Sequence, residues 1–187
     1  MRARIELTRI DNRLVHGQVG LTWGSTLNID TIVVVDNLTA ASSFAQKLMQ
    51  SVASAASRQI RFYTVHDFIR AYNDNTSHQK LFVVVQSPHE ARLLVEAGIE
   101  LKRVNVGNMH YEKGRVAFNR KVYLTQPDIE DINYMISQGT EVFYQDVPGS
   151  AVEKFSELDY ETMKRRREMV FAFVYMHVEN GKAGTTQ

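Results

Sequence analysis

The sequence predicts an α/β fold with a mostly parallel, open, seven-stranded sheet and helices on both faces. Seven short apolar stretches alternate with segments of helical periodicity, the pattern of repeated strand–helix–strand units. Thr31–Val35 is a continuous apolar run, which is typical of a parallel strand buried on both faces. With 187 residues, the chain is long enough for one well-buried domain.

The positions of the strands and helices follow from the apolar stretches and from the segments of helical periodicity. Strands are expected at residues 5–10, 31–35, 60–65, 81–86, 104–106, 121–124 and 141–145. Helices are expected at residues 17–27, 39–56, 66–72, 87–98, 127–139 and 150–158. Because parallel strands need covered faces, these helices should pack on both sides of the sheet.

Two helix starts carry local signals. Ser87 is a natural N-cap, Pro88 fits the first helical position and Glu90 completes a capping box. Ser150 and Glu153 have the same spacing, so a second capping box is expected to open the helix at 150–158.

The helix at 39–56 is expected to face the core through one apolar stripe. The stripe consists of Phe44, Leu48, Met49, Val52 and Ala56.

We assign residues 1–160 to the domain and residues 161–187 to a C-terminal extension. Basic residues at 164–167 precede eight apolar residues at 169–176 and then a tail expected to be mobile. The apolar run predicts a helix or strand docked on the domain or on a second copy of it, which would make the chain a homo-oligomer. The alternative is a segment that touches a membrane or a membrane partner.

Composition excludes several classes of function. Lys plus Arg number 22 and Asp plus Glu 21, so the chain has no large net positive charge that would attract nucleic acid. The absence of cysteine excludes disulfides and thiolate metal sites, and no histidine pair has metal-ligand spacing. With no signal-peptide pattern and no apolar run near the ~20 residues of a membrane span, a cytoplasmic location without a metal or cofactor is expected.

Four loops should share one edge of the sheet. The loops beginning at Asp11, Asp36, Ser87 and Gly107 each follow a strand, and the carboxyl ends of parallel strands meet at the same edge. Ligands of such folds bind beyond this edge, where the strand order reverses. Asn108 and His110 belong to the loop at 107–111, and a tight turn there is favoured over a nucleotide site.

The loop at 9–18 concentrates chemistry around one histidine. A neutral His16 imidazole could accept a phosphoryl group, and the Arg13 fork could bind its oxygens. Free N–H groups at Gly17 and Gln18 could help at a helix start, and Asp11 could hold Arg13 or orient the imidazole.

The residue types alone favour an ordinary loop. In that reading His16 is hydrogen-bonded to Asp11, while Arg9 and Arg13 are solvated or paired on the surface. Residue types alone therefore leave the function of the loop open.

The order of the residues is more specific. Residues 9–19, Arg-Ile-Asp-Asn-Arg-Leu-Val-His-Gly-Gln-Val, closely resemble the Arg-Ile-Asp-Asp/Glu-Arg-Leu-Ile/Val-His-Gly-Gln-Val signature of one protein family. It belongs to the IIB subunits of the mannose and sorbose class of the bacterial sugar phosphotransferase system. The resemblance continues at Trp23, 104–111 and 145–148, and covers about residues 3–158.

This resemblance implies a cytoplasmic phosphocarrier that associates transiently with the membrane. It would take a phosphoryl group from a histidine of a IIA subunit and deliver it to a sugar held by the membrane subunits IIC and IID. The phosphohistidine falls on His16, with phosphate on Nδ1, the phosphate-stabilising arginine on Arg13 and the loop aspartate on Asp11. The loop at 107–111 looks like that of members serving N-acetylgalactosamine or galactosamine.

The sequence leaves the roles of Asn12 and His110 undecided. Asn12 stands where the family usually has an acid, which removes one negative charge beside the loop. His110 could approach His16 or be an exposed loop residue.

A receiver-like or anion-binding regulatory domain of the same fold class is the alternative function. In that reading Asp36, at the end of a buried strand, would be the phosphoaccepting residue.

Overall fold

A computed structural model of the chain describes residues 3–17, 19–74 and 76–165. Its main sheet has the strand order β3-β2-β4-β1-β5-β8-β9, and every pairing is parallel except the antiparallel one between β8 and β9. The strands of this sheet are β1 Arg4–Ile10, β2 Thr31–Val35, β3 Gln59–Tyr63, β4 Lys80–Val85, β5 Arg103–Val106, β8 Glu141–Tyr144 and β9 Glu153–Lys154. The predicted sheet of seven mostly parallel strands is confirmed.

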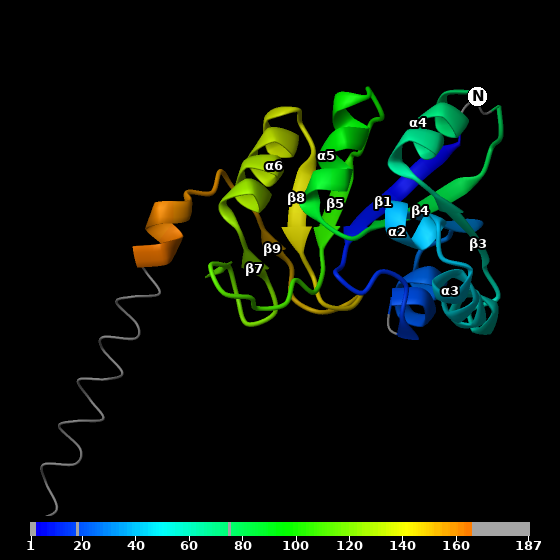
Figure 1. The fold of residues 1–187 in the computed structure, drawn as a ribbon, viewed down its shortest axis with the longest axis horizontal. Helices are drawn as coiled ribbons and strands as arrows, with labels where there is room; N and C mark the ends of the chain where they lie inside the picture. The colour runs from blue at the N-terminus through cyan, green and yellow to red at the C-terminus, as the bar shows by residue number, and fades with distance from the viewer. Residues whose placement is uncertain (1–2, 18, 75, 166–187) are drawn as a thin grey trace, which may run out of the picture.

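Helices cover both faces of the sheet (Figure 1). The face covered by α4 (Val65–Asp74), α5 (Pro88–Glu96) and α6 (Gln126–Ser137) holds the larger core cluster, which includes Phe68 and Leu94. The other face packs against the π-helix η1, Val19–Trp23, and against α3, Ser43–Ala55. Two short helices, α1 Gly24–Thr26 and α2 Asn37–Ala40, complete the set.

The capping box predicted at Ser87 is confirmed. Ser87 Oγ accepts from the N–H of His89, and Glu90 accepts from the N–H of Ser87, which completes the capping box of α5. Gly98 has φ 79°, a conformation that costs other residues energy, so the helix ends there.

The predicted strand at 121–124 lies outside the main sheet. Its part β7, Tyr123–Leu124, pairs with β6, Val116–Ala117, in a separate two-stranded antiparallel sheet. The seventh strand of the main sheet is instead β9, within the segment for which a helix was predicted.

The second capping box, at Ser150, was therefore a wrong prediction. Ser150 Oγ donates to the carbonyl of Val147 at 2.8 Å and so closes a turn, and Gly149 has φ 89°. After this turn the chain pairs with β8, and Phe155 is buried and stacks on Phe118 with ring centroids 4.0 Å apart. Long-range pairing and burial outweigh the local helix signal.

The apolar stripe of α3 was wrong at two of its positions. Met49 and Val52 pack against the core, but Phe44 and Leu48 are 72% and 55% exposed. Successive helical residues differ by about 100° around the axis, so Leu48 and Met49 cannot both point straight at the sheet. Ala53, fully buried, completes the inward side.

Residues 160–165 are helical, and Tyr160 and Met163 pack against the larger core cluster. The apolar run at 169–176 and the tail, for which docking and mobility were predicted, lie outside the described residues. Within the described residues, no helix combines the length and apolar character that crossing a membrane requires.

The outward orientation of Leu48 predicts that truncating this side chain costs much less stability than truncating the buried Leu94. We expect Leu94→Ala to lower the free energy of unfolding by about 2–5 kcal/mol, because Leu94 is fully buried in α5. The same change at Leu48 should stay within about 0.5 kcal/mol, because its side chain is largely exposed. Urea denaturation of both variants measures the difference, and equal losses would contradict the exposed position of Leu48.

Candidate active site

The loop after β1 lies at the centre of the carboxyl edge of the sheet. β1 pairs with β4 on one side and β5 on the other, and the N–H groups of Asp11 and Gly107 donate to Val85 and Ile10 across these strands. The chain leaving β1 runs toward β2, whereas the chains leaving β4 and β5 run toward β5 and β8. Strand order therefore reverses at β1, where folds of this kind bind ligands.

Arg9 is buried beneath this loop rather than solvated on the surface. Its Nη2 and Nε donate to Asp11 Oδ2 at 2.8 and 3.2 Å, and its Nη1 donates to Asn105 Oδ1 at 2.5 Å and to the carbonyl of Gln145 at 3.4 Å. The guanidinium also lies 5.5 Å from the ring centroid of Trp23. Burial lowers the pKa of Arg9, and the charge of Asp11 opposes this effect.

Gly107 leaves room for the Arg9 guanidinium. A Cβ atom at position 107 would overlap Nη2, Cζ and Nε of Arg9. Glycine is needed here because of this close approach.

Asp11 connects the buried arginine to the histidine. Its side chain is fully buried, and its Oδ1 accepts from the N–H of Arg13 at 3.1 Å and lies 3.4 Å from Nε2 of His16. Burial raises the pKa of Asp11, but the contact with His16, the charge of Arg9 and the Arg13 N–H together hold it below its ordinary value. Asp11 is thus an ionised carboxylate that faces His16.

A left-handed residue brings the histidine back toward this carboxylate. Leu14 has φ 54°, and its N–H donates to the carbonyl of Asp11 at 2.9 Å. This conformation costs a non-glycine residue roughly 1–2 kcal/mol. Burial of Leu14 and Val15 in the core below η1 offsets this cost.

His16 lies at the boundary between buried and solvent-exposed surroundings. Its side chain is 20% exposed, whereas Nε2 is buried and forms no well-aligned hydrogen bond with any described residue. The N–H of Gly20 donates to the carbonyl of His16 at 2.9 Å, so a helical turn starts directly after the histidine, with Gly17 exposed in it. Gln18 lies outside the described residues.

Arg13 is the cation of the loop that remains available. Its side chain is exposed, and it forms no hydrogen bond or ion pair with the rest of the described chain. Asp11 accepts from the backbone N–H of Arg13 and not from its guanidinium. Of the two roles predicted for Asp11, orienting the imidazole fits this geometry, whereas holding the Arg13 side chain does not.

Asn12 ties the loop to its neighbour. Its Oδ1 accepts from the N–H of His110 at 2.8 Å, and its own N–H donates to the carbonyl of Asn108 at 3.0 Å. The Asn12 amide thus accepts the hydrogen bond that a carboxylate at this position could accept, but it carries no negative charge. The His110 side chain is exposed, and no hydrogen bond joins it to His16 among the described residues.

Asp36 and Ser87 lie at the same edge but act as helix caps. The buried carboxylate of Asp36 accepts from the N–H of Thr39 at 2.7 Å at the start of α2. Ser87 caps α5 as described above. Neither residue contacts His16.

Asn105 was not among the predicted site residues. It is fully buried, and besides accepting from Arg9 its Nδ2 donates to the carbonyl of Gln145 at 3.1 Å. A polar residue inside a short apolar strand was the available signal. Trp23, whose indole N–H donates to the carbonyl of Asp146 at 3.3 Å, closes the same region from η1.

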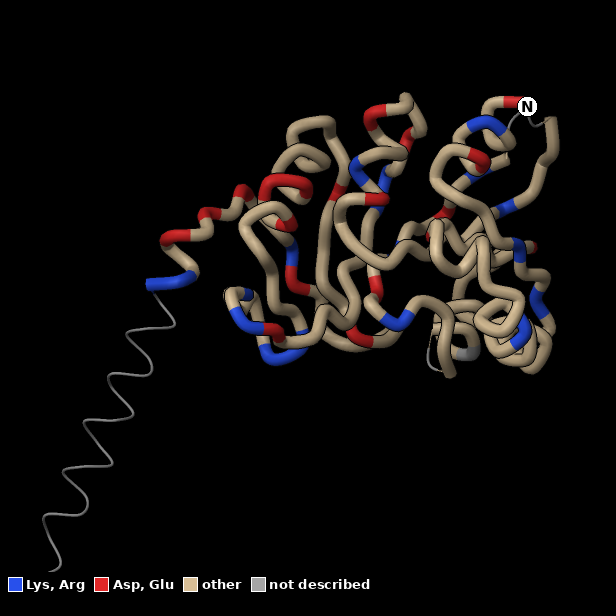
Figure 2. The backbone as a smooth tube through the Cα atoms, viewed as in Figure 1, with Lys and Arg blue, Asp and Glu red and all other residues tan. Residues whose placement is uncertain are grey.

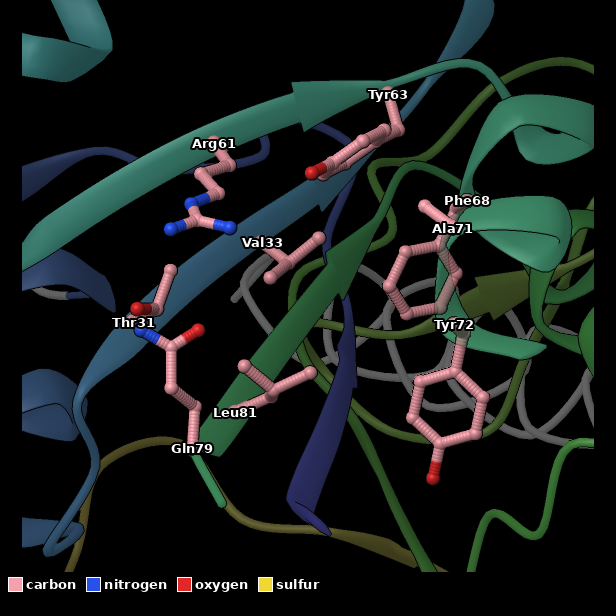
Figure 3. A pocket seen from close by; sticks show the side chains of 9 residues that line it. All are labelled: Thr31, Val33, Arg61, Tyr63, Phe68, Ala71, Tyr72, Gln79 and Leu81. Atoms are coloured by element: carbon pink, nitrogen blue, oxygen red, sulfur yellow. The ribbon is translucent and has the colours of Figure 1, made fainter. Parts of the chain in front are cut away.

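A small hollow lies elsewhere, between α4 and the strands β2 to β4 (Figure 3). Arg61, Tyr63, Phe68 and Tyr72 are among its lining residues, and none of the predicted site residues is. Its volume of about 20 Å³ holds roughly one water molecule. The described residues contain no cluster of three metal-ligating side chains.

Comparison with known proteins gives the class of this site. Residues 5–169 match the family described as "PTS system sorbose subfamily IIB component", and the chain belongs to this family of phosphotransferases. The chain is 45% identical over 153 residues to the N-acetylgalactosamine-specific phosphotransferase enzyme IIB component 1 of Escherichia coli, covering 82% of this chain and 97% of that protein. It is 35% identical to component 2 of the same organism, covering 82% and 98%.

A solved structure agrees with this assignment. The crystal structure of the N-acetylgalactosamine-specific IIB component 1 from Escherichia coli superposes with a TM-score of 0.79, covering 82% of this chain and all of that one. The predicted family resemblance is thereby confirmed.

The contact between Gly107 and Arg9 can be tested with a matched pair of substitutions. We expect Gly107→Ala to lower the free energy of unfolding by about 1–3 kcal/mol, because the added methyl group displaces a buried, ion-paired guanidinium. Gly17→Ala should be neutral or slightly stabilising, since no atom lies within 4 Å of a Cβ there. Thermal or urea unfolding measures both, and a neutral Gly107→Ala would refute the close approach.

Asp11 should make stability depend on pH. Its folded-state pKa lies below the unfolded value of about 3.9, so its contribution is present above that value and is lost as the pH falls through the folded pKa. We expect Asp11→Asn to cost about 3–5 kcal/mol near neutral pH, because Arg9 loses its buried partner, and the difference from wild type to shrink below about pH 4.

Urea unfolding between pH 3 and pH 7 would measure this difference. Asp74→Asn, at an exposed position in α4, is the control for general acid effects. A deficit in Asp11→Asn that stays constant over the whole range would contradict the depressed pKa.

Proposed function

We propose that this chain accepts a phosphoryl group on His16 from a IIA subunit and passes it to a sugar held by membrane IIC and IID subunits. The chain's membership of the IIB family supports this role. The observation that carries the assignment to His16 is the contact between its Nε2 and the buried carboxylate of Asp11.

That contact selects the tautomer of the imidazole. An ionised carboxylate only accepts hydrogen bonds, so the nitrogen that faces Asp11 carries the proton. In the neutral ring the proton on Nε2 leaves the lone pair on Nδ1, which is turned away from Asp11. Nδ1 is therefore the nucleophile, and Asp11 stabilises the cationic ring that results when Nδ1 bonds to phosphorus.

The transfer consists of two exchanges of one phosphoryl group. In the first, the N–P bond of the donor histidine breaks as the bond between His16 Nδ1 and phosphorus forms. In the second, a sugar hydroxyl oxygen bonds to phosphorus, the bond to Nδ1 breaks, and the hydroxyl proton leaves to a base. The exposed guanidinium of Arg13 and the N–H groups at the helix start after His16 are suited to the phosphoryl oxygens.

The sugar is assigned to the N-acetylgalactosamine type. Both Escherichia coli relatives described above carry that specificity in their names. Because the sugar would be bound by the membrane subunits, the chain would act in the cytoplasm and meet the membrane only through IIC and IID. Residues 1–160 would form the phosphocarrier domain and residues 161–187 its extension.

The receiver-like alternative is less well supported. The carboxylate of Asp36, which would have to accept the phosphoryl group, is buried and caps α2. An acceptor on a receiver domain needs an accessible carboxylate oxygen, and the cap occupies this one.

The test is phosphorylation of His16→Ala by a cognate phosphorylated IIA subunit. We expect no detectable phosphoprotein, whereas His78→Ala, at an exposed loop position, should be labelled like wild type. The wild-type label should be acid-labile and alkali-stable. Labelling of His16→Ala, or a hydroxylamine-sensitive label, would reject the proposed role.

A further inference from the structure

The described chain exposes three large apolar side chains on one helix pair. Leu38 of α2 is 76% exposed, and Phe44 and Leu48 of α3 are 72% and 55% exposed. Phe44 and Leu48 are four residues apart, so they lie on the same side of α3. We call the surface formed by these three residues the α2–α3 face.

The α2–α3 face has a cation and no acid of its own. Between Asn12 and His66 the sequence has only two acids: Asp30, which precedes β2 at the opposite edge of the sheet, and Asp36, which is buried. Of the four cations in the same stretch, Lys47 is exposed on α3 and Arg13 on the His16 loop. Arg58 donates to the carbonyl of Gly24, and Arg61 lies on the side of β3 that faces α4. Figure 2 shows acidic positions along α4, α5 and α6 but none along α3.

The α2–α3 face adjoins the loop that carries His16. α2 begins directly after β2, at the carboxyl edge of the sheet. α3 also packs closely on η1, the helix that follows His16, because a Cβ atom at Gly20 would overlap the side chain of Val52. A protein that covers His16 from this side therefore also meets the α2–α3 face.

We propose that the α2–α3 face is a docking surface for the protein that delivers the phosphoryl group to His16. The inference rests on the proposed function of His16. The occupant is a protein that presents a phosphohistidine from a partly apolar, partly acidic surface. A phosphorylated donor is anionic and so complements a cationic surface, whereas a neutral sugar on the acceptor does not.

Exposed apolar groups suit such a contact because it must form and separate in every cycle. Interfaces of this kind are small, and a few large side chains carry most of their binding energy. Phe44 is the largest exposed side chain of the three and thus the expected centre of the contact.

The experiment measures phosphoryl transfer from a phosphorylated IIA subunit to the full chain as the donor concentration varies. We expect Phe44→Ser to raise KM for the donor about tenfold, and Phe44→Ser with Leu48→Ser to raise it further, while the rate at saturating donor stays unchanged. Val152→Ser is the matched control: Val152 is 49% exposed but lies next to β9, at the other end of the sheet. Its KM should equal that of wild type.

Chemical labelling with phosphoramidate separates this inference from the proposed function. Equal labelling of His16 in the wild type and in Phe44→Ser shows that the site itself is intact. An unlabelled His16 in the wild type would count against the proposed function. An unchanged KM for the donor would overturn the docking surface, whether the substitutions then affect transfer to the membrane subunits, self-association of the chain or nothing measurable.

Discussion

The ion pair between Arg9 and Asp11 is the interaction on which the rest of the site depends. Both side chains are removed from water, and each buried charge costs several kcal/mol unless it is fully paired. Asn105 and the carbonyl of Gln145 accept from Nη1 of Arg9, and glycine at position 107 leaves space for the guanidinium. The pair therefore links β1, β5 and the loop after β8 into one support for the His16 loop.

This support explains how a loop can hold the His16 side chain in place. Asp11 accepts from the Arg9 guanidinium through Oδ2 and from the Arg13 N–H through Oδ1. These bonds fix the carboxylate so that Oδ1 also faces Nε2 of His16. The left-handed turn at Leu14 is strained, yet burial of that leucine retains it. Strain of this kind persists where the surrounding structure over-determines the backbone.

The two sides of the His16 loop differ in a way that suits a carrier. One side is tied through Asn12 to the loop at 107–111, so the loops after β1 and β5 are joined directly. The other side continues into η1 and α3, and α3 exposes Phe44 and Leu48 and has no acid. A carrier has to release each partner after transfer, and a rigid site beside a small apolar surface combines precise positioning with modest affinity.

Much of this architecture could be predicted from local sequence. The buried run at Thr31–Val35, the capping box at Ser87 and the position of His16 at a strand end depend on nearest neighbours, and the structure has them where the sequence indicates. The pairing of β9, the outward side of α3 and the burial of Arg9 depend on residues distant in the chain. A capping signal at Ser150 loses to the pairing with β8, and Asn105 of β5 and Gln145 of the loop after β8 meet the buried Arg9 from distant parts of the chain. The sequence by itself thus determined the fold class, the family motif and the place of the His16 loop after β1. Only the tertiary structure decided which charges are buried and which apolar side chains stay exposed, because burial is a property of contacts between segments that the chain brings together when it folds.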